Sequence, residues 1–239
     1  MNIWDDCDGA KHIAYMELEA VRVVESQSYI ATRRLVDSDE EQLLLEQMID
    51  NTKPDYPQEK KCTNMHYLLA TPFRYPPLLF GSRFGHKSER GIFYASSSLQ
   101  TSFSEAAYYR RVFMQHTEAK LAPSMIGYTT FWTDIATKKG IELTCLPFNR
   151  YEKMISDPTS HEVSQALGSH MRNAGVEAFT FTSARCKDQG ENIALFTPRA
   201  FKSLVPKKIQ QWDCYVDQST VSFHSRMEVA RYSFASSSR

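Results

Sequence analysis

Residues 73–111 include arginines beside aromatic residues, a tyrosine at the end of an apolar run and a glutamate early in an expected helix, in a spacing that suits a phosphorylated ligand. Arg74 precedes Tyr75, Arg83 follows a turn rich in proline and glycine, and Tyr94 ends an apolar run. The planar guanidinium group matches phosphate oxygens bidentately, and an aromatic ring can stack on a ligand ring. The alternatives are surface arginines held in ion pairs and a core role for Tyr94.

Glu105 supplies the carboxylate of this stretch, and two roles are open to it. Ser102-Phe103-Ser104-Glu105 fits a capping box, in which the glutamate stabilises the start of a helix. The functional alternative places the carboxylate near the anomeric carbon of a ribose. There it would hold a hydroxyl group and stabilise an oxocarbenium-like transition state, as carboxylates do in glycoside cleavage.

Two serines are candidates for a hydrogen bond to a carboxamide or phosphate. Ser164 lies in an expected helix, and Ser183 follows an expected strand with Arg185 close by. The alternative for each is a structural turn serine, and neither lies in the GxSxG elbow of a serine hydrolase. The seven histidines show no HExxH spacing, so we expect no metal site.

The first part of the chain carries helical patterns. Residues 12–35 contain few helix breakers and predict one or two amphipathic helices. Ser38 to Glu41 fit a capping box, and Leu44, Leu45, Met48 and Ile49 form an i, i+4 stripe that Pro54 ends. We therefore expect a helical N-terminal extension over residues 1–60 that packs on a catalytic domain over residues 61–239, with a partner-binding arm as the alternative role of the extension.

The remainder mixes strands and helices, which argues for an α/β or α+β fold. The segment up to Tyr75 is expected to be extended, because Pro76 disfavours a helical Tyr75. Gly175 marks the end of a helix. The expected strands are 91–95, 125–132, 141–146, 176–181, 192–196 and 214–216, and the expected helices are 101–115 and 160–174.

Composition limits the function classes. The 28 basic and 28 acidic residues cancel, which weakens an interpretation as a DNA-binding protein. Five widely spaced cysteines without a CxxC pair indicate a reducing, cytoplasmic setting. The acidic start is not a secretory signal, and no stretch approaches the ~20 apolar residues that span a bilayer.

Taken together, the ordered segments FRYPP, GSRFG, GIFYASSS, TSFSEAAYYR, SQALGSHMRNAGVEAF and TSARCKDQGENIALF resemble the RES domain family. The resemblance covers roughly residues 66–200. It matches Arg74, Arg83, Tyr75, Tyr94 and Glu105 to the family's arginines, tyrosines and glutamate. For the family's serine, both Ser183 and Ser164 are candidates.

The resemblance implies a compact mixed-sheet domain like the ADP-ribosyltransferase toxins and an enzyme that consumes NAD⁺ at the nicotinamide–ribose bond. NAD⁺ would be a substrate, no metal would be needed, and the acceptor could be water, phosphate or a protein side chain. Many members are toxins neutralised by a helix-turn-helix antitoxin, and a homodimer is compatible with this pattern. The alternatives are an ADP-ribosyltransferase that modifies a specific protein and a non-catalytic nucleotide- or partner-binding module.

Overall fold

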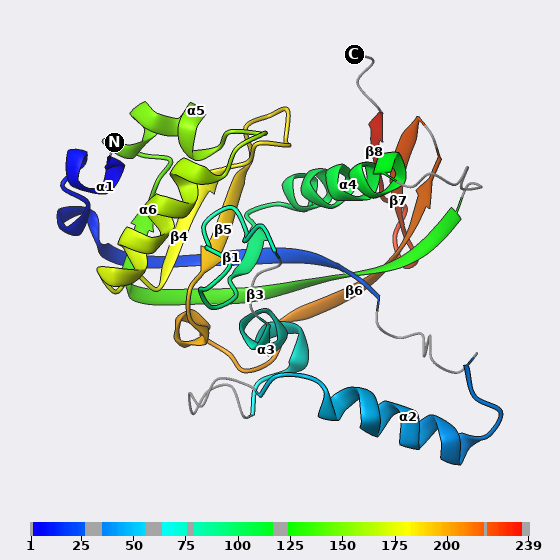
Figure 1. The fold of residues 1–239 in the computed structure, drawn as a ribbon. Coiled ribbons are helices and arrows are strands. Elements are labelled where there is room, and N and C mark those ends of the chain that lie inside the picture. The colour runs from blue at the N-terminus through cyan, green and yellow to red at the C-terminus, as the bar shows by residue number, and fades with distance from the viewer. Residues whose placement is uncertain are drawn as a thin grey trace.

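The computed structural model describes residues 2–26, 35–55, 64–75, 79–116, 124–217 and 219–235. It is a mixed α/β fold built on one eight-stranded sheet with helices on both faces (Figure 1), which confirms the expected fold class. The strands are β1 Ala14–Glu25, β2 Phe93–Ser96, β3 Ser124–Glu142, β4 Ala178–Thr182, β5 Glu191–Leu195, β6 Lys208–Val216, β7 Thr220–Ser225 and β8 Arg231–Ala235. The α-helices are α1 Ile3–Asp6, α2 Asp39–Asn51, α3 Tyr67–Arg74, α4 Leu99–His116, α5 Glu152–Ile155 and α6 Glu162–Asn173. Short 3₁₀ helices occupy Gly9–His12, Phe148–Tyr151 and Pro198–Ala200.

The long strand β3 organises the sheet, whose order is β1-β2-β5-β4-β3-β6-β7-β8. One edge of β3 pairs with β1 from Tyr128 to Gly140, and the other edge pairs first with β6 and then, in parallel, with β4. A contact between β1 and β2 at Val21 and Ser96 completes a ring of pairings through β1, β2, β5, β4 and β3. The two long strands cross the whole molecule in Figure 1.

Three apolar clusters fix the helices to this sheet. In the first, α1 and α6 cover β4 and β5 around Phe84 and Phe179. In the second, α3 covers the opposite face around Phe93. In the third, Phe103 of α4 packs against Trp212 of β6. The helices α4 and α6 are therefore anchored on either side of the strand ends that carry the candidate site.

The helices predicted over residues 12–35 are wrong for the part that the structure describes. Residues 14–25 form β1, and residues 27–34, including Ile30, lie outside the described ranges. The run AYMELEA is rich in helix formers, but Met16 and Ala20 are buried on one face of a strand whose backbone pairs with β3. Sheet pairing with a distant segment overrides a local preference of this size.

The capped helix at Ser38 is confirmed as α2. The Ser38 hydroxyl accepts a hydrogen bond from the amide of Glu41 at 3.1 Å, while the Glu41 carboxylate accepts from the amide of Asp37. The expected packing of its apolar stripe is not seen among the described residues, because Leu44 and Met48 are both 58% exposed. Figure 1 shows α2 projecting away from the sheet.

The expected extended segment before Tyr75 is also wrong, since residues 67–74 form the helix α3. His66 caps this helix by accepting the amide of Leu68 at 3.2 Å, and Leu69 and Phe73 bury its inner face against the sheet. Tyr75 itself is extended, as its position before a proline requires.

Most of the remaining expectations agree with the structure. The helices predicted over 101–115 and 160–174 are α4 and α6, and the helix-ending Gly175 has a φ of 79°. The runs at 176–181 and 192–196 form β4 and β5, which pair antiparallel in one sheet. The strand predicted at 125–132 lies within β3, but the one predicted at 141–146 is wrong beyond its first two residues, because β3 ends at Glu142 and a turn follows. Among the described helices, none has the length and apolar character that crossing a bilayer requires.

Candidate functional site

Glu105 lies inside α4, and side chains from two strands hold its carboxylate. Its Oε1 accepts hydrogen bonds from Ser183 Oγ at 2.6 Å and from Asn192 Nδ2 at 2.7 Å. The capping-box interpretation of Glu105 is wrong, because α4 starts at Leu99 and the amide of Thr101 is bonded to Ser98 Oγ. Neither hydrogen bond uses Oε2, which has no hydrogen-bond partner among the described residues and stays available to a ligand.

The donors to Glu105 are themselves fixed. The Ser183 hydroxyl oxygen accepts the backbone amides of Arg185 at 3.1 Å and Cys186 at 3.0 Å, so its hydrogen is directed to Glu105. The amide oxygen of Asn192 accepts from Ser96 Oγ at 2.8 Å, which orients its nitrogen toward the same carboxylate. Glu105 is thus preorganised by the polypeptide and does not depend on a ligand for its orientation.

Arg83 lies in the tight turn that the GSRFG segment forms. The amide of Ser82 donates to the carbonyl of Gly85 at 2.8 Å, and the guanidinium Nη1 of Arg83 donates to the carbonyl of Asp157 at 2.8 Å. Burial lowers the pKa of Arg83, and the Glu105 carboxylate acts in the opposite direction. The two groups therefore interact electrostatically, although no ion pair within 4.0 Å joins them in the described chain.

Tyr94 and α6 hold the Arg83 turn. The Tyr94 hydroxyl accepts from the amide of Phe84 at 3.0 Å and lies 2.9 Å from Ser82 Oγ. Ser164 Oγ donates to the carbonyl of Arg83 at 2.6 Å. Gly168 faces the carbonyl of Phe84 so closely that a Cβ there would come within 2.0 Å of it. These contacts come from α6 and β2, and together they hold the backbone of the turn at Arg83 and Phe84.

The structure separates the two serine candidates and gives Tyr94 a supporting position. Ser183 contacts Glu105 directly, whereas Ser164 is fully buried and contacts the backbone of Arg83. Burial raises the pKa of Tyr94 to about 12, so its hydroxyl stays protonated at neutral pH. Its hydrogen bonds to Ser82 and Phe84 are those of a residue that supports the turn.

Arg74 and Tyr75 are not brought to this cluster. Arg74 Nε donates to the carbonyl of Pro54, and its Nη1 lies 3.7 Å from the Asp50 carboxylate of α2. Together with Asp55 they line a separate pocket of about 350 Å³. Arg74 and Tyr75 therefore lie at a different site from Arg83, although all three residues belong to one short stretch of the sequence.

Three residues near Glu105 were not assigned a role from the sequence. Asn192 comes from β5, and Tyr109 follows Glu105 by one helical turn and is 59% exposed. Partial burial and then the Glu105 carboxylate raise the pKa of Tyr109. Arg185 stacks on Tyr108, with its Cζ 3.4 Å from the ring centroid. The i, i+4 spacing of Glu105 and Tyr109 could have identified the tyrosine, but nothing local marks Asn192.

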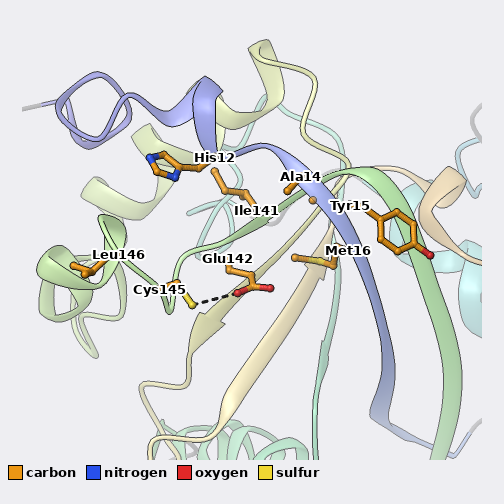
Figure 2. A pocket seen from close by; sticks show the side chains of 9 residues that line it. His12, Ala14, Tyr15, Met16, Ile141, Glu142, Cys145 and Leu146 are labelled. Atoms are coloured by element: carbon orange, nitrogen blue, oxygen red, sulfur yellow. Dashed lines mark hydrogen bonds between the residues drawn. The ribbon is translucent and has the colours of Figure 1, made fainter.

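Another pocket is lined by residues that do not belong to the Glu105 cluster. Figure 2 shows this pocket of about 230 Å³ between the start of β1 and the end of β3, where the Cys145 thiol donates to Glu142 at 3.2 Å. None of Arg83, Glu105 and Ser183 lines it. Within the described ranges, no group of three or more His, Cys, Asp or Glu side chains could hold a metal ion.

Comparisons with known proteins agree with this architecture. The RES domain profile matches residues 58–217. A chain from the crystal structure of the M. tuberculosis MbcT–MbcA toxin–antitoxin complex superposes with a TM-score of 0.52 at 10% sequence identity, over 88% of this chain and 91% of that chain. At this identity the likeness concerns the fold alone. No curated protein matches the sequence.

Proposed function

This chain belongs to the RES domain family, and on that premise we propose that it is an NAD⁺-consuming enzyme that acts as the toxin of a toxin–antitoxin pair. The reaction we propose is cleavage of the nicotinamide–ribose bond. With water as acceptor, NAD⁺ and H₂O give ADP-ribose, nicotinamide and one H⁺. With phosphate as acceptor, the product is a 1-phosphorylated ADP-ribose.

The observation that carries the proposal is the Glu105 carboxylate, which Ser183 and Asn192 hold through Oε1 while its Oε2 makes no hydrogen bond to the described residues. As the C–N bond breaks, positive charge develops on the ribose, and a fixed carboxylate stabilises that charge without having to reorient. The unoccupied oxygen can accept a hydrogen bond from a ribose hydroxyl. Because nicotinamide leaves as a neutral molecule, no general acid is needed for its departure.

Arg83 supports the same proposal by providing a cation beside this carboxylate. Its guanidinium is oriented by the Asp157 carbonyl and opposed by no ion-paired acid among the described residues. Such a group suits the phosphates of a dinucleotide. Tyr94 and Ser164 support its turn, and the exposed Tyr109 offers a ring beside Glu105 on which a ligand ring can stack.

The partner we propose is an antitoxin protein. Its support is the similarity in fold to a chain of a toxin–antitoxin complex. For Arg74 and Tyr75, the family resemblance suggests phosphate and ring contacts, but the contacts of Arg74 with α2 and Pro54 argue for a supporting position of that arginine.

Incubation of the purified protein with NAD⁺, with and without phosphate, followed by mass spectrometry of the products tests this function. We expect nicotinamide together with ADP-ribose or its 1-phosphate. Glu105→Gln should abolish product formation, whereas the control Glu142→Gln, a carboxylate of the pocket in Figure 2, should retain it.

Three outcomes would contradict the proposal. If the Glu105→Gln variant consumes NAD⁺ at the parent rate, the assignment of Glu105 as the essential carboxylate is wrong. ADP-ribose attached to a protein target, in place of free product, establishes a transferase. NAD⁺ binding without nicotinamide release over hours establishes a non-catalytic binding module.

A further inference from the structure

A second guanidinium group lies beside Arg83. Arg83 Nη1 donates to the carbonyl of Asp157 at 2.8 Å, and Arg185 Nη2 donates to the carbonyl of Pro158 at 2.7 Å. Asp157 and Pro158 are consecutive, so their Cα atoms are only about 3.8 Å apart. One short loop thus holds two positively charged forks next to each other, although the arginines come from segments far apart in the sequence.

The charges of this pair are only partly balanced by neighbouring acids. Among the described residues, neither arginine forms an ion pair within 4.0 Å. The carboxylate of Asp157, whose Oδ1 accepts the amides of Thr159 and Ser160, and the carboxylate of Glu105 both interact electrostatically with Arg83. The field of the two arginines reaches His161 as well, because burial and then the positive charges of Arg83 and Arg185 lower the pKa of that imidazole.

Arg185 is fixed in place with part of its donor set unused. Its guanidinium is stacked on Tyr108 at 3.4 Å, and its Nε is buried and has no hydrogen-bond partner among the described residues. Its Nη1 also makes no hydrogen bond to the described residues and is not buried, so it can donate to a bound anion. Ser183 joins this arrangement to the carboxylate, since its hydroxyl both donates to Glu105 and accepts the Arg185 amide.

We propose that Arg185, stacked on Tyr108, pairs with Arg83 to bind the diphosphate of the dinucleotide. Two adjacent forks match two linked phosphate groups better than a single phosphate. The pair therefore favours substrates that contain a diphosphate, such as NAD⁺ or ADP-ribose, over nicotinamide riboside, which contains no phosphate. The identity of the dinucleotide rests on the proposed function, while diphosphate binding does not require catalysis.

Isothermal titration calorimetry with inorganic pyrophosphate and with ADP-ribose tests the pair directly. We expect Arg185→Gln to weaken both affinities about 10- to 100-fold, the range for loss of charge-assisted hydrogen bonds. Arg185→Lys keeps the charge but loses the fork, and should give an intermediate loss. Arg231→Gln, on the exposed strand β8, is the matched control and should bind both ligands as the parent does.

Steady-state kinetics distinguishes ligand binding from general damage. For Arg185→Gln we expect a rise in KM for NAD⁺ that exceeds the change in kcat, with an unchanged thermal unfolding midpoint. Pyrophosphate and ADP-ribose affinities equal to the parent's in a folded Arg185→Gln protein would overturn the proposal. So would a loss of these affinities in Arg74→Gln with none in Arg185→Gln.

The two proposals fail in different ways. If the protein binds pyrophosphate through Arg185 but releases no nicotinamide from NAD⁺, the proposed function fails and the arginine pair stands. If Arg185→Gln cleaves NAD⁺ with the parent KM, the pair fails and the function stands.

Discussion

Ser183 donates its hydroxyl hydrogen to Glu105 at 2.6 Å, although the two residues are 78 positions apart in the chain. The serine follows β4, the glutamate lies within α4, and the ring of paired strands brings them together. The contact links a residue of the proposed reaction to the loop that carries Arg185. Several measurable consequences depend on it.

The two serine candidates should differ in their effect on catalysis. Ser183→Ala removes one of two donors to Glu105, so we expect kcat for NAD⁺ consumption to fall about 10- to 100-fold. It should also lower the unfolding free energy, because the amides of Arg185 and Cys186 lose their acceptor. Ser164→Ala removes a buried hydrogen bond to the Arg83 carbonyl and should cost about 1–3 kcal/mol of stability. Urea unfolding and steady-state kinetics of both variants measure the contrast. Equal kcat values for Ser183→Ala and the parent would refute the role of this contact.

Tyr94→Phe should destabilise the Arg83 turn, because the amide of Phe84 loses its acceptor. We expect a cost of about 1–3 kcal/mol and a smaller loss of activity than for Ser183→Ala. The pKa of Tyr94, about 12 in the folded protein, exceeds the value of ~10 in an unfolded chain. Its contribution to stability is thus present below pH ~10 and lost as pH rises toward 12. Unfolding measured between pH 9 and 12 should show a shallower fall for Tyr94→Phe than for the control Tyr215→Phe.

His161 should make the protein less stable in mild acid. Its pKa is lowered by burial and then by Arg83 and Arg185, with Asp157 opposing them. The folded state therefore binds fewer protons than the unfolded state, and stability falls as pH decreases through the unfolded pKa of ~6.5. We expect His161→Gln to flatten the decline between pH 7 and pH 5 in urea unfolding. A decline as steep as that of the exposed-site control His86→Gln would contradict this expectation.

Gly168→Ala should separate α6 from the Arg83 turn. The added Cβ would lie 2.0 Å from the carbonyl oxygen of Phe84. Rotation of a side chain cannot relieve this clash, because the positions of both atoms are fixed by the backbone. We expect a loss of about 1–3 kcal/mol or more in unfolding free energy, with lower NAD⁺ turnover. Gly127→Ala in β3, where the nearest atom would be 3.3 Å away, is the control and should cost less. An unchanged unfolding midpoint for Gly168→Ala would show that the helix does not fix the turn.

The sequence predicts the elements whose signals are local. The helix α6 has a periodic apolar face and the stop at Gly175, and β4 and β5 are short apolar runs separated by a polar loop. The strand β1 was predicted wrongly because its residues favour a helix and its pairing partner lies more than 100 residues away. Helix α3 is not predicted because the restriction that Pro76 places on Tyr75 does not extend to the residues before it, and the helix ends at Arg74.

The candidate site follows the same division. Glu105 and Arg83 were identified by residue type and by family resemblance, but the choice between Ser183 and Ser164 required the tertiary structure. Asn192 gave no local signal, because only the pairing of β5 with β2 brings its side chain to the carboxylate. Arg74 belongs to the FRYPP segment, but its side chain contacts Asp50 of α2. The sequence does not predict this contact, because it depends on how α3 and α2 are arranged in the fold.

The ring of paired strands also sets where the polypeptide can be trimmed. A recombinant piece cut to residues 58–217 would lack β1, β7 and β8, and eleven residue positions of β3 would lose their partners in β1. Unpaired strand edges of this length recruit other chains. We therefore expect such a truncation to be insoluble or to self-associate in size-exclusion chromatography. The smallest stable unit is set by the strand pairings and extends beyond the residues that the RES domain profile matches.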